Sequence, residues 1–407
     1  MSSASPASGH DRHLWQSFYG GLQKMGRSLQ LPIAVLPAAG ILNRLGQPDV
    51  FGDKGLGWTK VAAVIAAAGG TIFDNLPLLF CIGVAIGFAK KADGSTALAA
   101  LVGYLCYHNV LTVYPDKAGN PQNPGVLGGI VVGLIAAVTW RRFYRTKLVD
   151  WLGFFNGRRL VPILMSFIGL FLGVIFGLVW QPIGDGLDSF ATWLSGLGAW
   201  GSGIYGVINR LLIPIGMHQF INTYMWFQFG SYTDPSTHKV VMGDINRFYA
   251  GDPTAGQWMS GFYPIMMFAL PAAAMAIAAC AKPERRKATY GMMLSVALTS
   301  FVTGVTEPIE FSFMYVAPVL YVVHALLTGA SMAITWALGV HDGFTFSAGL
   351  IDYALAWNHA TKPWMIIPIG VCFAIVYYAL FRILIPALNL PTPGREPDED
   401  VIDTTKA

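Results

Sequence analysis

Charged residues are scarce in this sequence. Only 12% of its 407 residues are Asp, Glu, Lys or Arg, which is roughly half the fraction found in an ordinary soluble domain. By contrast, 54% of the residues are hydrophobic, and several windows of roughly 20 apolar residues are long enough to cross a bilayer as a helix. No polar segment is long enough to form a soluble domain, so the sequence predicts an all-α polytopic membrane protein.

Three further features limit the classes of function that are possible. The cysteines lie singly in apolar segments without a CxxC pair, which favours small buried hydrophobes over a redox or metal site: Cys81, Cys106, Cys280 and Cys372. The N-terminus lacks the apolar core of a signal peptide, so the first span is expected to act as its own insertion signal. The net charge is +4, and the basic residues lie in short clusters beside apolar runs, which is typical of residues that set membrane topology. We therefore expect no cofactor, no metal and no nucleic-acid partner.

The apolar runs predict about ten spans, with two elements interrupted by Gly or Pro. Residues 1–11 are small and polar, and we expect them to be disordered. Residues 12–29 repeat apolar side chains at helical spacing, which predicts an amphipathic helix on the membrane surface. Residues 391–407 are polar and acidic, which predicts a disordered tail.

Basic clusters indicate the orientation in the membrane. They lie before the first predicted span, after the second and fourth, and again after a later one: Arg12, Lys24 and Arg27; Lys90 and Lys91; Arg141 to Lys147; and Lys282 to Lys287. Cytoplasmic loops carry an excess of Lys and Arg, so we predict cytoplasmic basic loops and cytoplasmic N- and C-termini. Because helices in the second half are broken, the sequence does not decide on which side of the membrane each later loop lies.

The stretch GVTEPIEF places two glutamates in the middle of a long apolar region. Glu307 and Glu310 are the only Asp, Glu, Lys or Arg residues between Ala288 and Val340. An ionisable group at membrane depth costs roughly 2.5–3.5 kcal/mol on insertion scales, so such groups line a polar cavity or pair with a partner. Pro308 lacks a backbone donor and disfavours helix at Glu307, which predicts a helix break with Glu307 facing a site. Glu310 is expected to support that geometry, with a direct substrate role as the alternative.

A second broken polar segment is NRLLIPIGMHQFINT, in which Arg210 and His218 lie eight residues apart across a Pro-Gly break. Arginine can neutralise a phosphate or donate to several hydroxyls, and histidine can donate, accept or carry a proton near neutral pH. The alternatives are an interfacial Arg210 and a His218 that is hydrogen-bonded in the core. Two broken polar segments predict a site built from discontinuous helices, suited to a hydroxylated or phosphorylated ligand.

Other polar residues are weaker candidates. Asp74 and Asn75 precede a proline and either contact the site or cap a helix. We expect a loop to be ordered by Asp244, Arg247 and Asp252. His341 and Asp342 are expected to lie at a helix end near the site, and His108 and His324 are expected to occupy the core or an interface.

Five motifs together resemble the membrane component, enzyme IIC, of the sugar phosphotransferase system. In chain order they are QLPIAVLPAAGILNRLGQPD, GGTIFDNLPLLFCIGVAIGFAKK, NRLLIPIGMHQ, GDINRFYAGDPTAG and GVTEPIEFSFMYVAPVLY. The similarity runs from about residue 12 to residue 396 and is to the glucose branch of the family. The combination of GDINRFYAGDPTAG with RLGQPD looks most like its N-acetylglucosamine members.

This resemblance implies a permease that takes a sugar from outside and releases it inside as the 6-phosphate. The phosphoryl group would come from a phosphocysteine on a cytoplasmic enzyme IIB domain, so the chain would be the membrane part of a phosphotransferase. The resemblance also implies a homodimer in the bacterial cell membrane. Residues 30–185 would form the dimerisation scaffold, and residues 186–390 would carry the sugar between two hairpin loops by an elevator movement.

The resemblance also assigns roles to residues. The family's TEP glutamate falls on Glu307, its histidine after the Pro-Gly break on His218, and its upstream arginine on Arg210. Glu307 and His218 are the predicted catalytic residues, because they could accept the proton of the C6 hydroxyl and orient the sugar or the incoming phosphate. Arg210 would offset the phosphate charge. Thr306 completes the predicted substrate-binding set.

The cysteines depart from the pattern of many relatives, which carry a fused IIB domain with a phosphorylated cysteine followed by basic residues. No such motif is present, so the donor is expected to be a separate protein, unless the domain was lost from this chain. The basic segments Arg141 to Lys147 and Lys282 to Lys287 are candidate docking surfaces for it or plain topology determinants.

Two other functions fit the residues alone. One is an ion-coupled sugar symporter that uses Glu307 and His218 as a proton relay, and the other is a membrane enzyme or receptor that binds sugar without moving it. Within the family, glucose is the rival substrate. It differs from N-acetylglucosamine at C2, a difference that one or two pocket residues could read.

Overall fold

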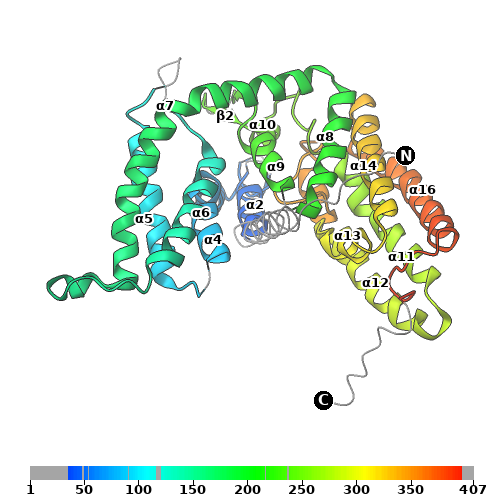
Figure 1. The fold of residues 1–407 in the computed structure, drawn as a ribbon. Helices are drawn as coiled ribbons and strands as arrows, with labels where there is room; N and C mark the ends of the chain where they lie inside the picture. The colour runs from blue at the N-terminus through cyan, green and yellow to red at the C-terminus, as the bar shows by residue number, and fades with distance from the viewer. Residues whose placement is uncertain are drawn as a thin grey trace, which may run out of the picture. The chain divides into compact units, whose positions relative to one another are not determined.

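The computed structural model describes residues 35–47, 50–53, 55–89, 91–115, 121–215, 217–235 and 238–396. Within these ranges the chain is mostly helical, as predicted, and it divides into two compact units (Figure 1). The first unit contains the described residues up to Phe190 together with Leu212–Tyr224. The second contains Ala191–Leu211 together with the described residues from Met225 onward. The predicted disordered segment 1–11 and amphipathic helix 12–29 lie outside the described residues.

The first part of the chain forms helices α2 (Leu36–Leu45), α3 (Thr59–Asp74), α4 (Leu76–Phe88), α5 (Gly94–Leu111), α6 (Gly125–Phe143) and α7 (Leu160–Gly196). Helices α4, α5 and α6 pack together, and α7 contributes its first turns to the same core. Small and aromatic side chains fill this core, among them Cys81, Ala100, Tyr107, Ala136 and Trp140. The core of the first unit thus lies among apolar helices, as hydrophobic runs of this length predict.

Two glycines bring α6 close to α4. A Cβ atom at Gly129 would lie 2.1 Å from the carbonyl oxygen of Pro77, and one at Gly133 would lie 2.4 Å from that of Cys81. Membrane helices gain little hydrophobic energy by associating, so they pack through small residues that let backbones approach. The glycines of α6 are therefore a requirement of this helix pair.

The junction between α3 and α4 is a sharp bend of 57°. Asn75 lies at the bend, and its side-chain amide donates to the carbonyl oxygen of Thr71 at 2.9 Å. Both Asp74 and Asn75 are exposed. Of the two roles considered for this pair, the structure supports helix capping by Asn75.

From α8 onward the elements are α8 (Ala199–Leu212), α9 (His218–Phe227), β1 (Ser231–Thr233), β2 (Val240–Met242), α10 (Asp244–Tyr249), α11 (Leu270–Cys280), α12 (Pro283–Thr303), α13 (Glu307–Met314), α14 (Pro318–Ala337), α15 (Leu350–Ala356) and α16 (Ile366–Ala387). Strands β1 and β2 form an antiparallel hairpin with Tyr232 opposite Val241. The all-α prediction missed this hairpin, whose strands are too short to show a clear alternating pattern. Helix α11 packs against both α12 and α16.

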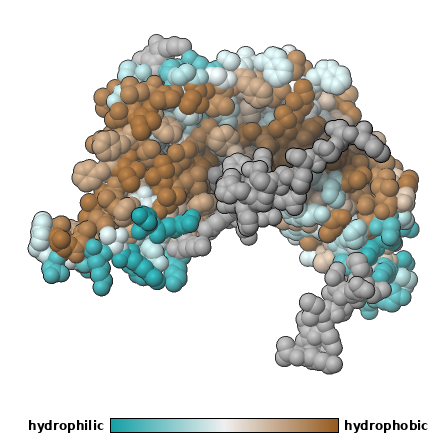
Figure 2. All heavy atoms as spheres, viewed as in Figure 1, coloured by the Kyte–Doolittle hydropathy of each residue, from teal (hydrophilic) through white to brown (hydrophobic). Residues whose placement is uncertain are grey.

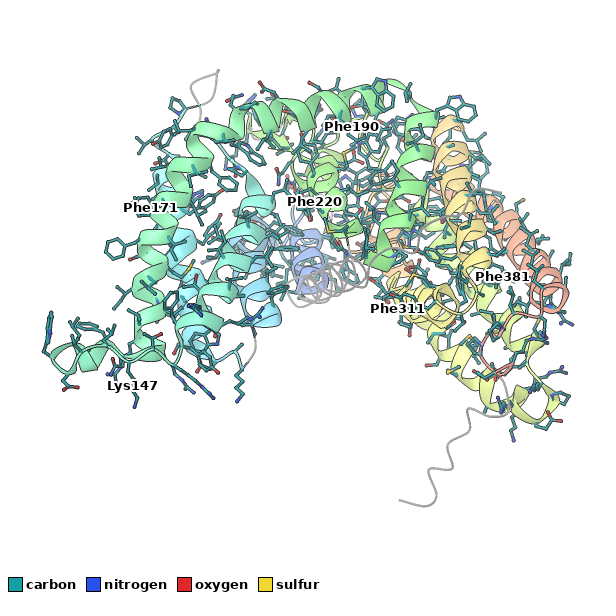
Figure 3. All side chains as sticks on the ribbon, in the orientation of Figure 1. Lys147, Phe171, Phe190, Phe220, Phe311 and Phe381 are labelled. Atoms are coloured by element: carbon teal, nitrogen blue, oxygen red, sulfur yellow. The ribbon has the colours of Figure 1, made fainter. Side chains whose placement is uncertain are left out.

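Apolar faces cover much of the visible helical surface (Figure 2). Four helical segments in the described ranges are long and apolar enough to cross a membrane: Gly125–Phe143, Gly157–Gly196, Pro318–Ala337 and Pro363–Ala387. The bent pair of α3 and α4 is a fifth if it forms one span. Phe171 points outward from α7 (Figure 3) and is 63% exposed, as suits a lipid-facing side chain. The number of spans and the two re-entrant hairpins stay predictions.

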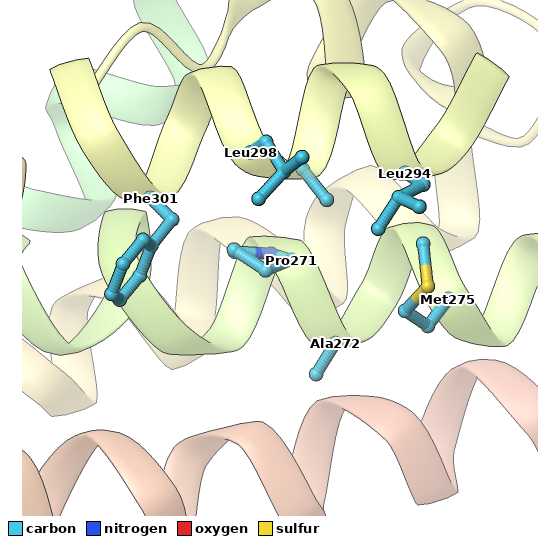
Figure 4. A pocket seen from close by; sticks show the side chains of 7 residues that line it. Pro271, Ala272, Met275, Leu294, Leu298 and Phe301 are labelled. Atoms are coloured by element: carbon cyan, nitrogen blue, oxygen red, sulfur yellow. The ribbon is translucent and has the colours of Figure 1, made fainter. Parts of the chain in front are cut away.

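A groove lies between α11 and α12 (Figure 4). Its lining residues are all apolar: Pro271, Ala272, Met275, Leu294, Ala297, Leu298 and Phe301. Sugar sites need hydrogen-bonding groups in fixed positions. This groove offers no polar side chain, so it is not a candidate sugar site.

Two expectations about local structure need correction. Residues 391–396, placed in the disordered tail, are bonded to the start of α12: the Lys282 N–H donates to the Gly394 carbonyl oxygen at 3.0 Å, and Arg285 pairs with Glu396 at 3.1 Å. Glu396, beyond the last helix, pairs with Arg285 at the start of α12. Composition alone does not predict this contact. Cys81 and Cys280 are buried, as predicted, but Cys372 is exposed because it faces outward on an apolar helix.

Candidate functional site

The GVTEPIEF stretch forms the predicted helix break. Helix α12 ends at Thr303, and Gly304 follows with a left-handed backbone (φ 73°) that favours glycine. Thr306 precedes α13, and Pro308 lies in the first turn of that helix, where its missing donor has no intrahelical role. Glu307 is therefore the first residue of a new helix. The predicted break is present, but it lies at residues 304–306, directly before Glu307, and Glu307 itself is helical because the first turn of a helix tolerates a proline. Its side chain is partly buried.

A second loop, between α14 and α15, holds this break in place. The Ser347 hydroxyl donates to the Gly304 carbonyl oxygen at 2.8 Å, and a Cβ atom at Gly349 would lie 2.4 Å from the Gly304 nitrogen. Asp352 orders the loop by accepting hydrogen bonds from the backbone N–H groups of Thr345 and Ser347 at 2.8 and 3.2 Å. The backbone before Glu307 is thus braced by a neighbouring ordered segment.

Arg210, near the end of α8, is buried and paired with Glu310. Its Nη1 lies 2.6 Å from Glu310 Oε1, and the two side chains are 3% and 0% exposed. The guanidinium carbon lies 4.9 Å from the centre of the Phe262 ring, a cation–π contact. The Tyr321 hydroxyl donates to the carbonyl oxygen of Arg210. The interfacial alternative for Arg210 is therefore wrong.

The ion pair continues into the core through His324 and Tyr377. His324 Nε2 lies 3.2 Å from the same Glu310 oxygen, and its Nδ1 lies 2.9 Å from the Tyr377 hydroxyl. His324 is fully buried, which confirms its prediction as a core residue. Residues from α8, α13, α14 and α16 thus meet in one polar network.

Glu307 shares the region of this network. Its carboxylate interacts electrostatically with Glu310 and with Arg210. The structure therefore brings Arg210 and Glu307, two of the predicted site residues, into the same part of the second unit. Thr306, directly before Glu307, is buried.

His218 begins α9 and is partly buried. The side-chain amide nitrogen of Gln219 lies 3.0 Å from its Nε2. By its contacts His218 belongs to the first unit, whereas Arg210 and Glu307 belong to the second. Its convergence with those two residues stays a prediction.

The GDINRFYAGD segment orders a loop, as predicted. Asp244 accepts hydrogen bonds from the backbone N–H groups of Gly256 and Trp258, both at 2.9 Å. Arg247 pairs with Asp252 at 2.7 Å. Burial raises the pKa of Asp244 to about 6, against the effect of its two hydrogen bonds. These charges are engaged with one another and with the backbone of their own loop.

His341 and Asp342 follow the end of α14, as predicted. The Asp342 side chain is fully buried and accepts a hydrogen bond from the Gly343 N–H at 2.8 Å. His341 Nδ1 lies 3.1 Å from the Ala255 carbonyl oxygen. His108 stacks on Tyr104 in α5, with ring centres 5.7 Å apart. These observations give all three residues packing or loop contacts.

Helices of membrane length, a proline break that carries a carboxylate and a buried charge network are the features of an integral membrane transport component. A model of the family described as phosphotransferase system, EIIC, matches residues 26–329. The chain belongs to this family, as the motifs predicted.

Similar proteins match nearly the whole chain. It is 64% identical to the N-acetylglucosamine-specific EIIC component of Streptomyces coelicolor, over 100% of both chains. It is 51% identical to the N-acetylglucosamine-specific EIICB component of Bacillus subtilis, over 94% of this chain and 81% of that one. It is 50% identical to the N-acetylglucosamine-specific EIICBA component of Escherichia coli, over 95% of this chain but 58% of that one.

A solved structure shares the fold. The transporter ChbC, the IIC component of an N,N'-diacetylchitobiose-specific phosphotransferase system, matches with a TM-score of 0.55 over 91% of this chain and 93% of that one. Sequence identity is 16%, so this likeness concerns the fold alone.

Proposed function

We propose that this chain is the membrane permease of a sugar phosphotransferase system and that its substrate is N-acetylglucosamine. The printed specificity of the S. coelicolor, B. subtilis and E. coli relatives supports the substrate. The observation that carries the site is the position of Glu307, which opens α13 at a proline break within electrostatic range of the buried Arg210.

The proposed reaction transfers a phosphoryl group to the C6 hydroxyl of the bound sugar. The C6 oxygen bonds to phosphorus as the sulfur–phosphorus bond of a phosphocysteine on enzyme IIB breaks, and the cysteine leaves as a thiolate. Glu307 takes the hydroxyl proton, while His218 orients the sugar or the incoming phosphate. Phosphoryl transfer depends mainly on positioning and charge stabilisation, which a partly buried carboxylate at a fixed helix start can provide.

Arg210 and Thr306 complete the proposed substrate site. Arginine has five N–H donors, and the pair with Glu310 engages Nη1. The guanidinium thus keeps further donors for a sugar hydroxyl or a phosphate oxygen. Thr306 adds a hydroxyl directly before Glu307.

We propose further that the donor IIB is a separate chain in a bacterial cell, because the 64% identical relative is named as an EIIC component alone. The basic segments Arg141 to Lys147 and Lys282 to Lys287 are its proposed docking surfaces. The permease would act as a homodimer through residues 30–185, and residues 186–390 would move the sugar as an elevator.

Purified protein in liposomes tests this proposal. Labelled N-acetylglucosamine is supplied outside and phosphorylated IIB inside, and the sugar species that accumulates is identified. We expect N-acetylglucosamine 6-phosphate, formed only with the donor, and weaker formation of glucose 6-phosphate in a parallel assay. Free sugar that accumulates under a proton gradient without donor would contradict the proposal and indicate a symporter.

A further inference from the structure

The hydrogen bonds around Glu310 have a defined direction, because the carboxylate of Glu310 is the acceptor. Glu310 Oε1 receives Arg210 Nη1 at 2.6 Å and His324 Nε2 at 3.2 Å. A carboxylate oxygen can only accept hydrogen bonds, so Nε2 of His324 carries a proton and donates. One oxygen is thus held from two sides by two buried donors.

Tyr377 fixes the other side of the imidazole. Its hydroxyl lies 2.9 Å from His324 Nδ1 and 3.2 Å from the His324 carbonyl oxygen. With a neutral ring, the hydroxyl donates to Nδ1. With a charged ring, it accepts from Nδ1–H and donates to the carbonyl. In both cases Nε2–H stays directed at Glu310.

Stability alone does not explain such an arrangement. Buried ion pairs can often be replaced by apolar residues of similar size at no loss of stability, because desolvation offsets their attraction. What an apolar replacement cannot do is hold a guanidinium in one orientation. Side chains that orient a functional group through hydrogen bonds are how proteins keep a site within the tolerance that its chemistry needs.

We propose that His324 and Tyr377 are positioning residues that act through Glu310 on Arg210. The four side chains form one chain of contacts, Tyr377 to His324 to Glu310 to Arg210, which ends at the guanidinium that the proposed function assigns to substrate binding. This inference rests on the proposed function, because it takes Arg210 to contact the sugar or its phosphate. It adds two residues to the site that do not touch the substrate themselves.

Substitutions of His324 and Tyr377 test the proposal in the full chain reconstituted with phosphorylated IIB. His324→Leu removes the donor to Glu310 and is expected to raise the KM for N-acetylglucosamine about tenfold, as expected for a disturbed charged hydrogen bond. His324→Gln keeps a donor near the position of Nε2 and is expected to restore most of the affinity. Tyr377→Phe removes only the hydroxyl and is expected to raise the KM by a few-fold.

The readouts separate positioning from a purely structural role. Each variant's thermal unfolding midpoint is measured alongside its KM and kcat. A lower midpoint with an unchanged KM in both His324→Leu and Tyr377→Phe would overturn the positioning role while leaving the proposed function intact. The unmodified protein is assayed first. If it neither binds nor phosphorylates N-acetylglucosamine or glucose, the proposed function fails, and this inference falls with it.

Discussion

Glu307 and Glu310 lie one helical turn apart but in different surroundings. Glu310 is fully buried against Arg210 and His324, whereas Glu307 is partly buried at the start of α13. A carboxylate that already accepts from two buried donors is poorly placed to take a proton from a substrate. This difference supports the proposal that Glu307 acts as the base and that Glu310 organises the site.

Replacing Glu307 by Gln tests this division of roles. The substitution keeps the size of the side chain but removes the proton acceptor, so we expect the rate of sugar phosphorylation to fall by a factor on the order of 100 or more. Asp53→Asn, at an exposed position between α2 and α3 and outside both proposed docking segments, is the control and should retain the full rate. Initial rates of sugar phosphate formation by both variants decide the matter, and normal phosphorylation by Glu307→Gln would refute the assignment.

The Arg210–Glu310 pair predicts a pattern of stability across three variants. Arg210→Met and Glu310→Leu each leave one buried charge without its partner, which costs roughly 3–5 kcal/mol. The double variant buries two apolar groups instead, so we expect much of the lost stability to return while sugar binding stays absent. Thermal unfolding in detergent, with and without N-acetylglucosamine, measures both effects. A double variant as unstable as the sum of the singles would contradict this account.

At the scale of elements, sequence predicted the helix breaks better than the contacts between them. Pro308 disfavours helix at the residue before it, so local chemistry alone placed the break to within a few residues, although Glu307 itself is helical. The partner of Glu310 could not be placed in the same way, because Arg210 and His324 lie 100 and 14 residues away in the chain. Tyr377 gave no signal at all, since a tyrosine in an apolar helix is unremarkable by composition.

The packing of α4 against α6 gives a prediction at this scale. Gly133→Leu would place side-chain atoms where the Cys81 carbonyl oxygen lies, 2.4 Å from the new Cβ. Overpacking of this kind costs typically ~1–3 kcal/mol, so we expect a lower unfolding midpoint and less monodisperse protein. Gly70→Ala is the control, because a Cβ at Gly70 in α3 meets no atom within 4 Å. Equal behaviour of the two variants in size-exclusion chromatography and thermal unfolding would show that the close approach is not required.

For the molecule as a whole, the few clusters of basic residues predict the orientation in the membrane. Lys147 in the segment after α6 (Figure 3) and Arg286 in α12 are exposed members of the two basic clusters, whereas Asn123 is exposed in a nearly neutral loop before α6. Positively charged loops stay on the cytoplasmic side during insertion. The two basic positions should therefore share one side of the membrane, and Asn123 should face the other.

Single cysteines at these three positions test the orientation in living cells. In a variant without the four native cysteines that retains sugar phosphorylation, Asn123→Cys should react with a membrane-impermeant maleimide in intact cells. Lys147→Cys and Arg286→Cys should react only after the cells are opened, because the positive-inside rule predicts that both lie on the cytoplasmic side. Labelling of either basic position in intact cells would reverse the orientation at that segment. It would also remove that segment from the proposed docking surfaces, since a cytoplasmic donor could not reach it.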